Sequence, residues 1–135
     1  MKVKIIENTY KREKTKMPAI FGISLKSGCC RFTKTATKLT ELKALDKIVF
    51  VQNEEDKRDW YFRLAKDNEI GFVLRNNKGS SSAEILLFNS MALVCLIADS
   101  LSFIGKSAKC NISNELVDID GVEHWQLITG MIKNK

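Results

Sequence analysis

Short runs rich in β-branched and aromatic residues, separated by polar turn sequences, predict strands along most of this chain. The expected strands are 19–25, 29–33, 47–52, 60–64, 70–75, 83–88, 107–112 and 124–129. Turns containing Gly, Asn, Asp or Ser separate many of them, and Asp120-Gly121 is a strong hairpin turn pair. This order of elements favours an antiparallel meander.

Two segments predict helices instead. Thr33 can cap a short helix over 34–42. Asn89 or Ser90 can cap a longer helix over about 90–103. The middle of the longer helix is apolar nearly all round, so we expect it to be buried against the sheet.

Burial of the longer helix has consequences for single residues. Leu93, Leu96 and Ile97 should be core residues, and Leu96→Ala should cost about 2–5 kcal/mol of stability. Cys95 lies in the same apolar run and should resist thiol reagents in the native protein.

Together these elements predict an α+β fold, in which a curved antiparallel sheet of seven or eight strands packs on the helix at 90–103. The short helix near 34–42 completes it. The chain has 135 residues, enough for one domain. Residues 8–17 are polar and basic up to Pro18, so we expect a basic arm or linker over 1–17 and a single α+β domain over 18–135. The alternative for residues 2–6 is a sheet strand, because apolar and polar residues alternate there.

Alternation along the strands divides the sheet into two faces. The expected core face carries Phe32, Ile48, Phe50, Trp60, Phe62, Leu64, Phe72 and Leu74. The opposite face carries Arg31, Lys47, Tyr61, Arg63 and Arg75, together with Val49, Val51 and Val73. Cations around an aromatic ring suit a face that stacks bases and contacts phosphates. The alternatives are an ordinary solvated face, or a dimer interface over the valines.

The distribution of charge adds a second feature. The net charge is +6, but residues 1–47 contain 12 Lys and Arg against 4 Asp and Glu, a net charge of +8. The remaining 88 residues contain 10 against 12, a net charge of −2. Excess positive charge at one end suggests a phosphate-bearing partner, to which Lys11, Arg12, Lys14 and Lys16 would contribute. A solubilising arm is the alternative.

Several classes of protein are disfavoured. No apolar run reaches the 18 or so residues of a membrane span, and the start lacks the apolar core of a signal peptide, so we expect a cytoplasmic protein without a membrane partner. The four cysteines include no Cys-x-x-Cys pair and are expected to be free thiols. With His124 as the only histidine, no metal site is expected.

Catalytic motifs are also weak. His124 stands next to a tryptophan in an expected strand, where a structural role is more common. Gly105-Lys106-Ser107 resembles the end of a phosphate-binding loop but lacks its first glycine and preceding strand. Asp118-x-Asp120-Gly121 fits a hairpin turn better than a calcium loop, and the acidic stretch 53–59 is interrupted by cations. We therefore expect no enzyme and no cofactor.

One segment resembles a known family. It reads Ser27-Gly28-Cys29-Cys30-Arg31-Phe32-Thr33, then Ala36, Leu39 and Leu42-Lys43-Ala44-Leu45-Asp46-Lys47-Ile48-Val49-Phe50. These residues look like the strand, short helix, Leu-x-x-Gly-Asp-x-Val turn and strand of AbrB/MazE-type DNA-binding proteins, with Leu45 where that family has glycine. The whole outline is also similar to whirly-type single-strand-binding folds. Both resemblances imply nucleic-acid binding, but neither transfers binding residues to this chain.

The sequence thus predicts a non-enzymatic protein that binds DNA or RNA, with preference for single strands or with weak sequence selectivity. The competing hypothesis is a protein-interaction or structural module that forms a homodimer through its sheet. Binding that weakens steeply with salt would separate the two.

Overall fold

The computed structural model describes residues 18–76 and 85–130. In these ranges the chain forms nine strands and two helices. In chain order they are β1 (Ile20–Ser24), β2 (Cys29–Phe32), α1 (Lys34–Thr40), β3 (Lys47–Gln52), β4 (Trp60–Leu64), β5 (Phe72–Val73), β6 (Arg75–Asn76), β7 (Leu86–Asn89), α2 (Met91–Ser100), β8 (Ser107–Ile119) and β9 (Val122–Ile128).

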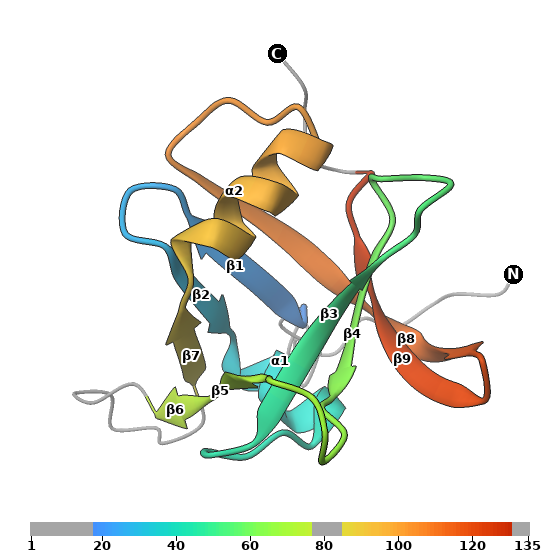
Figure 1. Ribbon diagram of the computed structural model, residues 1–135. Coiled ribbons are helices and arrows are strands. Elements are labelled where there is room, and N and C mark those ends of the chain that lie inside the picture. The colour runs from blue at the N-terminus through green and yellow to red at the C-terminus, as the bar shows by residue number, and fades with distance from the viewer. Residues whose placement is uncertain (1–17, 77–84, 131–135) are drawn as a thin grey trace, which may run out of the picture.

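All nine strands belong to one antiparallel sheet that curls until it is nearly closed (Figure 1). The strand order is β5-β3-β4-β9-β8-β1-β2-β7-β6. The two outermost strands, β5 and β6, are consecutive in the chain and are separated only by Leu74. The Leu74 N–H donates to the Asp46 carbonyl at 2.9 Å, and its carbonyl accepts from the Leu45 N–H at 2.7 Å. One bent segment therefore links both edges of the sheet.

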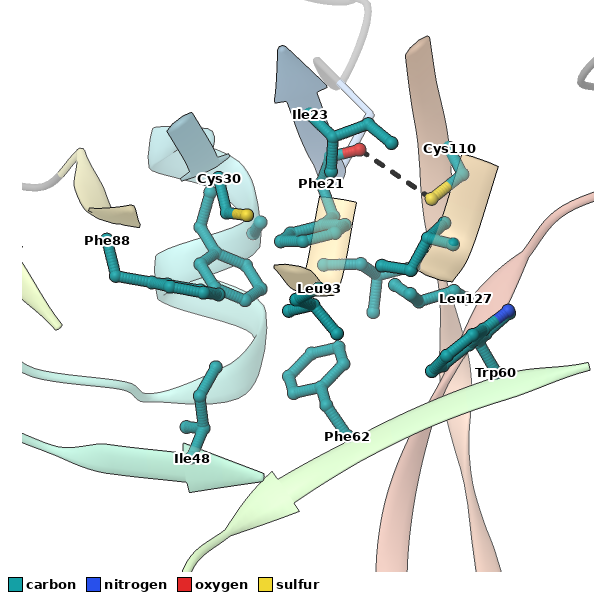
Figure 2. Close-up of a cluster of buried hydrophobic side chains, with 14 of the residues drawn as sticks. Phe21, Ile23, Cys30, Ile48, Trp60, Phe62, Phe88, Leu93, Cys110 and Leu127 are labelled. Carbon is teal, nitrogen blue, oxygen red and sulfur yellow. Dashed lines mark hydrogen bonds between the residues drawn. The ribbon is translucent and has the colours of Figure 1, made fainter. Parts of the chain in front are cut away.

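Phenylalanine rings fill the interior of the curled sheet (Figure 2). The ring centroids of Phe21 and Phe32 are 5.0 Å apart, and those of Phe72 and Phe88 are 4.9 Å apart. Phe50 contacts the rings of Phe21, Phe62, Phe72 and Phe88 and so connects β3 with strands on the far side of the interior. Ring contacts of this kind add to the stabilisation from buried area.

The helices cover opposite ends of the sheet (Figure 1). At the start of α2 the Ser90 hydroxyl accepts a hydrogen bond from the Leu93 N–H at 3.2 Å, as a helix N-cap does. At its other end the Trp60 indole N–H donates to the Ser100 hydroxyl at 2.8 Å, and the Arg58 guanidinium donates to the Leu101 carbonyl at 3.0 Å. These bonds connect α2 to the β4 side of the sheet.

Gly28 allows α2 to approach the β1–β2 turn. Its φ of 74° lies in the left-handed region, which favours glycine. A Cβ at this position would also lie 2.9 Å from the backbone nitrogen of Met91. The turn and the first residue of α2 could not pack this closely around any larger residue.

The predicted α+β class with a curved antiparallel sheet is confirmed, but details of the elements differ. The strand count of seven or eight was too low, because the strand expected at 70–75 is broken at Leu74 into β5 and β6. The helix expected over 34–42 ends at Thr40, where Glu41 adopts a left-handed conformation. The helix expected over 90–103 spans Met91–Ser100.

Three predictions of burial were wrong. Leu96 is 59% exposed and Cys95 is exposed, because only one side of α2 contacts the sheet. Leu64 is 57% exposed at the last position of β4. No helix in the two described ranges is long and apolar enough to cross a membrane.

Candidate nucleic-acid interface

The two predicted site residues of β4, Tyr61 and Arg63, donate hydrogen bonds to neighbouring carboxylates. Tyr61 faces outward, as the alternation predicted, and Trp60 faces the core. The Tyr61 hydroxyl donates to Asp59 Oδ2 at 2.6 Å. This hydrogen bond, with a smaller contribution from burial, raises the pKa of Tyr61 to about 12. The polar end of Tyr61 therefore already has a partner within the molecule.

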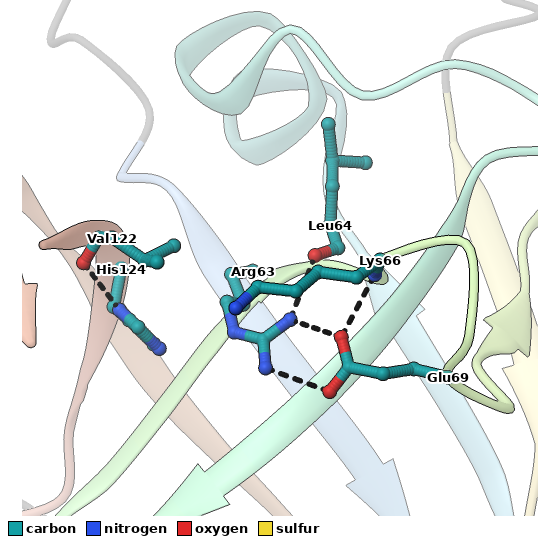
Figure 3. A network of polar contacts seen from close by, with 6 residues as sticks. All are labelled: Arg63, Leu64, Lys66, Glu69, Val122 and His124. Atoms are coloured by element: carbon teal, nitrogen blue, oxygen red, sulfur yellow. Dashed lines mark hydrogen bonds and ion pairs between the residues drawn. The ribbon is translucent and has the colours of Figure 1, made fainter. Parts of the chain in front are cut away.

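The Arg63 side chain makes more intramolecular hydrogen bonds than that of Tyr61 (Figure 3). Its Nη1 and Nη2 donate to Oε1 and Oε2 of Glu69 at 2.6 and 2.8 Å, and Nη1 also donates to the Leu64 carbonyl at 3.1 Å. Glu69 Oε1 accepts a further bond from the Lys66 N–H at 2.8 Å. The bond from Arg63, followed by the bond from Lys66, lowers the pKa of Glu69 to about 2. The charge of Arg63 is thus balanced by an intramolecular ion pair.

A different part of the sheet presents unbalanced positive charge. The register across five neighbouring strands places side by side, in this order, Lys109, Gly22, Arg31, Leu87 and Arg75. We call these five residues the cationic row. Directly paired residues of an antiparallel sheet share a face, and the three cations are exposed. Since neighbouring strands lie about 4.8 Å apart, successive cations of the row have Cα atoms about 10 Å apart.

Within the described part of the chain, the strand segments that carry the cationic row present no acidic residue outward. The outward-facing residues of β1, β2, β6, β7 and the first part of β8 are Ile20, Gly22, Ser24, Cys29, Arg31, Arg75, Leu87, Asn89, Ser107, Lys109 and Asn111. No ion pair between described residues involves a cation of the row. This surface therefore attracts anions, in contrast to β4.

The structure brings together some of the predicted site residues and separates others. Arg31 and Arg75 lie on either side of Leu87. Lys47 is exposed and lies opposite Val73, two positions before Arg75 in the chain, so it extends the same surface. Tyr61 and Arg63 lie on β4, which β9, β8 and β1 separate from β2. The remaining predicted residues, Lys11, Arg12, Lys14 and Lys16, lie outside the described residues.

Sequence reasoning missed Lys109 and Gly22. The alternation of Lys109 with the buried residues Ala108 and Cys110 is the signal that could have placed it outward. The pairing of β8 with β1, which joins segments about 90 residues apart, has no comparable signal in the sequence. Gly22 becomes part of the candidate site only because this pairing places it beside Lys109.

A hollow of about 310 Å³ opens on the cationic row where Gly22 has no side chain. Its lining residues are Gly22, Ile23, Ser24, Ser27, Cys29, Arg31, Ser107, Ala108 and Lys109. Among the described residues, the lining of the hollow therefore combines two cations with three hydroxyl groups and no carboxylate.

Other candidate chemistry receives less support from the structure. His124 is buried, and its Nδ1 lies 2.8 Å from the Val122 carbonyl, which is consistent with a structural role (Figure 3). Within residues 18–76 and 85–130 no cluster of His, Cys, Asp and Glu is arranged to hold a metal ion. The acidic stretch 53–59 instead supplies Asp59, which accepts hydrogen bonds from three neighbouring side chains.

Comparisons with protein-family models, curated proteins and solved structures find no match to this chain.

Proposed function

We propose that this protein binds nucleic acid without catalysis, through the cationic row. The observation that supports the proposal is the alignment of Arg31, Arg75 and Lys109 on a sheet surface without described acidic residues. Cations held on every second strand of one sheet keep a fixed spacing, so they can neutralise several phosphates of one backbone together. Lys47 lies at the Arg75 end of the row and adds a fourth charge.

The composition of the row also bears on selectivity. It contains cations, a glycine and a leucine but no aromatic ring or amide side chain, so phosphate contacts outweigh base contacts. Binding should then be weakly sequence-selective. Arg63 should contribute little charge, because Glu69 already pairs its guanidinium, and Tyr61 could contribute only by stacking through its ring, since its hydroxyl donates to Asp59.

Salt dependence gives the direct test. Fluorescence anisotropy with labelled single-stranded DNA, single-stranded RNA and duplex DNA should show affinity that falls linearly on a log–log plot against salt concentration. For the three cations of the row the slope should be about −2 for single strands and about −3 for duplex DNA, and a phosphate contact from Lys47 would steepen either slope by about 1. The absence of binding to all three probes at low salt would overturn the proposal.

Charge-removing variants locate the interface. Arg31→Gln, Arg75→Gln and Lys109→Gln should each weaken binding and reduce the salt slope by about 1 or less. Lys57→Gln is the matched control, because Lys57 is an exposed lysine in the loop between β3 and β4. If the row variants bind as tightly as the control, the nucleic acid uses another surface.

The second candidate function is self-association, and the exposed apolar side of α2 is the observation that favours it. Met91, Ala92, Cys95 and Leu96 are exposed there. A second copy of the chain could bury this patch against itself around a twofold axis. Sedimentation velocity should then show a dimer that Leu96→Glu converts to a monomer. A wild-type monomer at high protein concentration rejects this candidate.

A further inference from the structure

The hollow at Gly22 has the chemistry of a site for one anionic group. Arg31 and Lys109 flank it, since each is paired directly with Gly22 from a neighbouring strand. Each cation can donate several hydrogen bonds, and neither has an acceptor in an ion pair with a described residue. An anion placed over Gly22 would meet a positive charge on both sides.

Hydroxyl groups add neutral donors at one end of the hollow. The Ser24 hydroxyl accepts a hydrogen bond from the Ser27 N–H at 3.4 Å, and the Ser27 hydroxyl accepts one from the Cys29 N–H at 3.3 Å. Accepting these bonds leaves both O–H protons free to donate. Ser107, opposite Ser24 on β8, adds a third hydroxyl. The donors match a group with several acceptor oxygens.

The charge distinguishes between kinds of phosphate. A phosphodiester inside a nucleic-acid strand carries one negative charge, whereas a terminal phosphate monoester carries close to two at neutral pH and exposes three acceptor oxygens. The two cations and three hydroxyls, with no carboxylate among the described lining residues, fit the monoester better. We propose that the hollow over Gly22 binds the terminal phosphate of a nucleic-acid strand. This inference rests on the proposed function. It places the phosphorylated end of the bound strand at the Gly22 part of the cationic row.

The position and size of the hollow agree with this proposal. Its volume of about 310 Å³ is at the lower end of the range for small-ligand sites, so it has room for a phosphate and part of the attached nucleotide. Arg31 belongs both to the hollow and to the row, which continues through Leu87 to Arg75. A strand whose end lies over Gly22 can therefore extend its next phosphates along the row.

The first experiment compares ends of one oligonucleotide. Versions with a 5′-phosphate, a 3′-phosphate or hydroxyls at both ends should differ in affinity, one phosphorylated form binding at least fivefold more tightly than the hydroxyl form. The preference should weaken as pH falls below about 6, because the monoester gains a proton there. The charged and titratable residues that line the hollow in the described ranges are Arg31, Lys109 and Cys29, none of which is a histidine or carboxylic acid. Equal binding of all three ends overturns the inference and leaves the proposed function intact.

The second experiment fills the hollow without changing its charge. A Cβ at Gly22 would have its nearest neighbours at 3.8 Å, and no left-handed φ restricts this position, so Gly22→Val should fold. We expect Gly22→Val to lose the preference for phosphorylated ends but to retain salt-dependent binding of the hydroxyl-ended strand. Gly22→Ala, which fills less of the hollow, should give an intermediate preference. Retention of the full preference in a folded Gly22→Val protein rejects the site.

A third experiment separates this inference from the proposed function. In NMR spectra of the wild-type protein, a nucleoside monophosphate should shift the amide signals of Gly22, Arg31 and Lys109. In spectra of the Gly22→Val variant, the signals of Arg31 and Lys109 should stay in place when the monophosphate is added. If the monophosphate binds but no oligonucleotide does, the proposed function fails and the inference about a nucleic-acid end fails with it, whereas binding of oligonucleotides without a shift by the monophosphate rejects the inference alone. If neither binds, both fail.

Discussion

Leu93 and Leu96 lie one turn apart on α2, yet Leu93 is 5% exposed and Leu96 is 59% exposed. The buried side of the helix consists of Leu93, Val94, Ile97 and Ala98, which follow the spacing of one helical face. Leu96 lies about 60° around the helix axis from Leu93 and just outside this buried face.

This pair gives a matched stability test. Leu93→Ala should lower the free energy of unfolding by about 2–5 kcal/mol, because it creates a cavity beneath the helix. Leu96→Ala should change it by about 0.5 kcal/mol or less. Urea unfolding followed by circular dichroism measures both. A large cost for Leu96→Ala would mean that this side of α2 is covered in a dimer.

The cysteines should react with thiol reagents in a fixed order. Burial raises the pKa of both Cys30 and Cys110 to about 12, which suppresses their reactive thiolates at pH 8. Cys95 is exposed and Cys29 is half-buried. Ellman's reagent should therefore label Cys95 first, Cys29 more slowly, and the other two only on unfolding. Mass spectrometry of partly labelled protein identifies the sites, and early labelling of Cys30 would contradict the structure.

Leu45 offers a stabilising substitution. Its φ is 75°, and its side chain is 76% exposed. A left-handed conformation costs a residue with a Cβ about 1–2 kcal/mol, and replacing Leu45 by glycine removes this cost. Glycine also has more conformational freedom in the unfolded chain, which reduces the gain in stability by about 0.5–1 kcal/mol. Leu45→Gly should thus raise the melting temperature by a few degrees. Leu45→Ala retains the strain and should not, so equal melting temperatures of the two variants would argue against a strained backbone.

The ion pair of Arg63 and Glu69 should make stability depend on pH. Because the folded-state pKa of Glu69 is lowered from 4.5 to about 2, its contribution is present above about pH 4.5 and is lost as pH falls toward 2. The melting temperatures of wild type and Glu69→Gln should differ at pH 6 and converge near pH 2. Glu54→Gln, at an exposed position in the loop between β3 and β4, should follow the wild-type curve. A difference that persists at pH 2 would assign the effect to something other than this charge.

The alternation of apolar and polar residues within single strands made the strand bounds and side-chain orientations predictable from the sequence. The bounds of β3 and β4 agree with the expected strands 47–52 and 60–64, and Trp60 faces the core as expected. Within a single strand, the side-chain period of two determines these orientations directly.

Features that depend on distant pairing could not be predicted. The apolar residues of α2 surround the helix, so periodicity could not show which side meets the sheet. The cationic row requires β8 to lie beside β1, and the closure of the sheet requires a bend at Leu74. The sequence could place Arg63 on the outer face, but not the turn that brings Glu69 within 2.6 Å of it.

The link between β5 and β6 through Leu74 also affects how the molecule meets its neighbours. The outermost strands of an open sheet expose unpaired N–H and C=O groups, on which other chains can add and start ordered aggregates. Here the two outermost strands are two residues each and belong to one continuous segment, so they expose little free edge, whereas in the described part of the sheet the end of β8 beyond Ile112 pairs only with β9 and leaves its other edge free. Strand addition is therefore disfavoured where the sheet nearly closes, and within the described residues a free edge for another strand remains at the far end of β8.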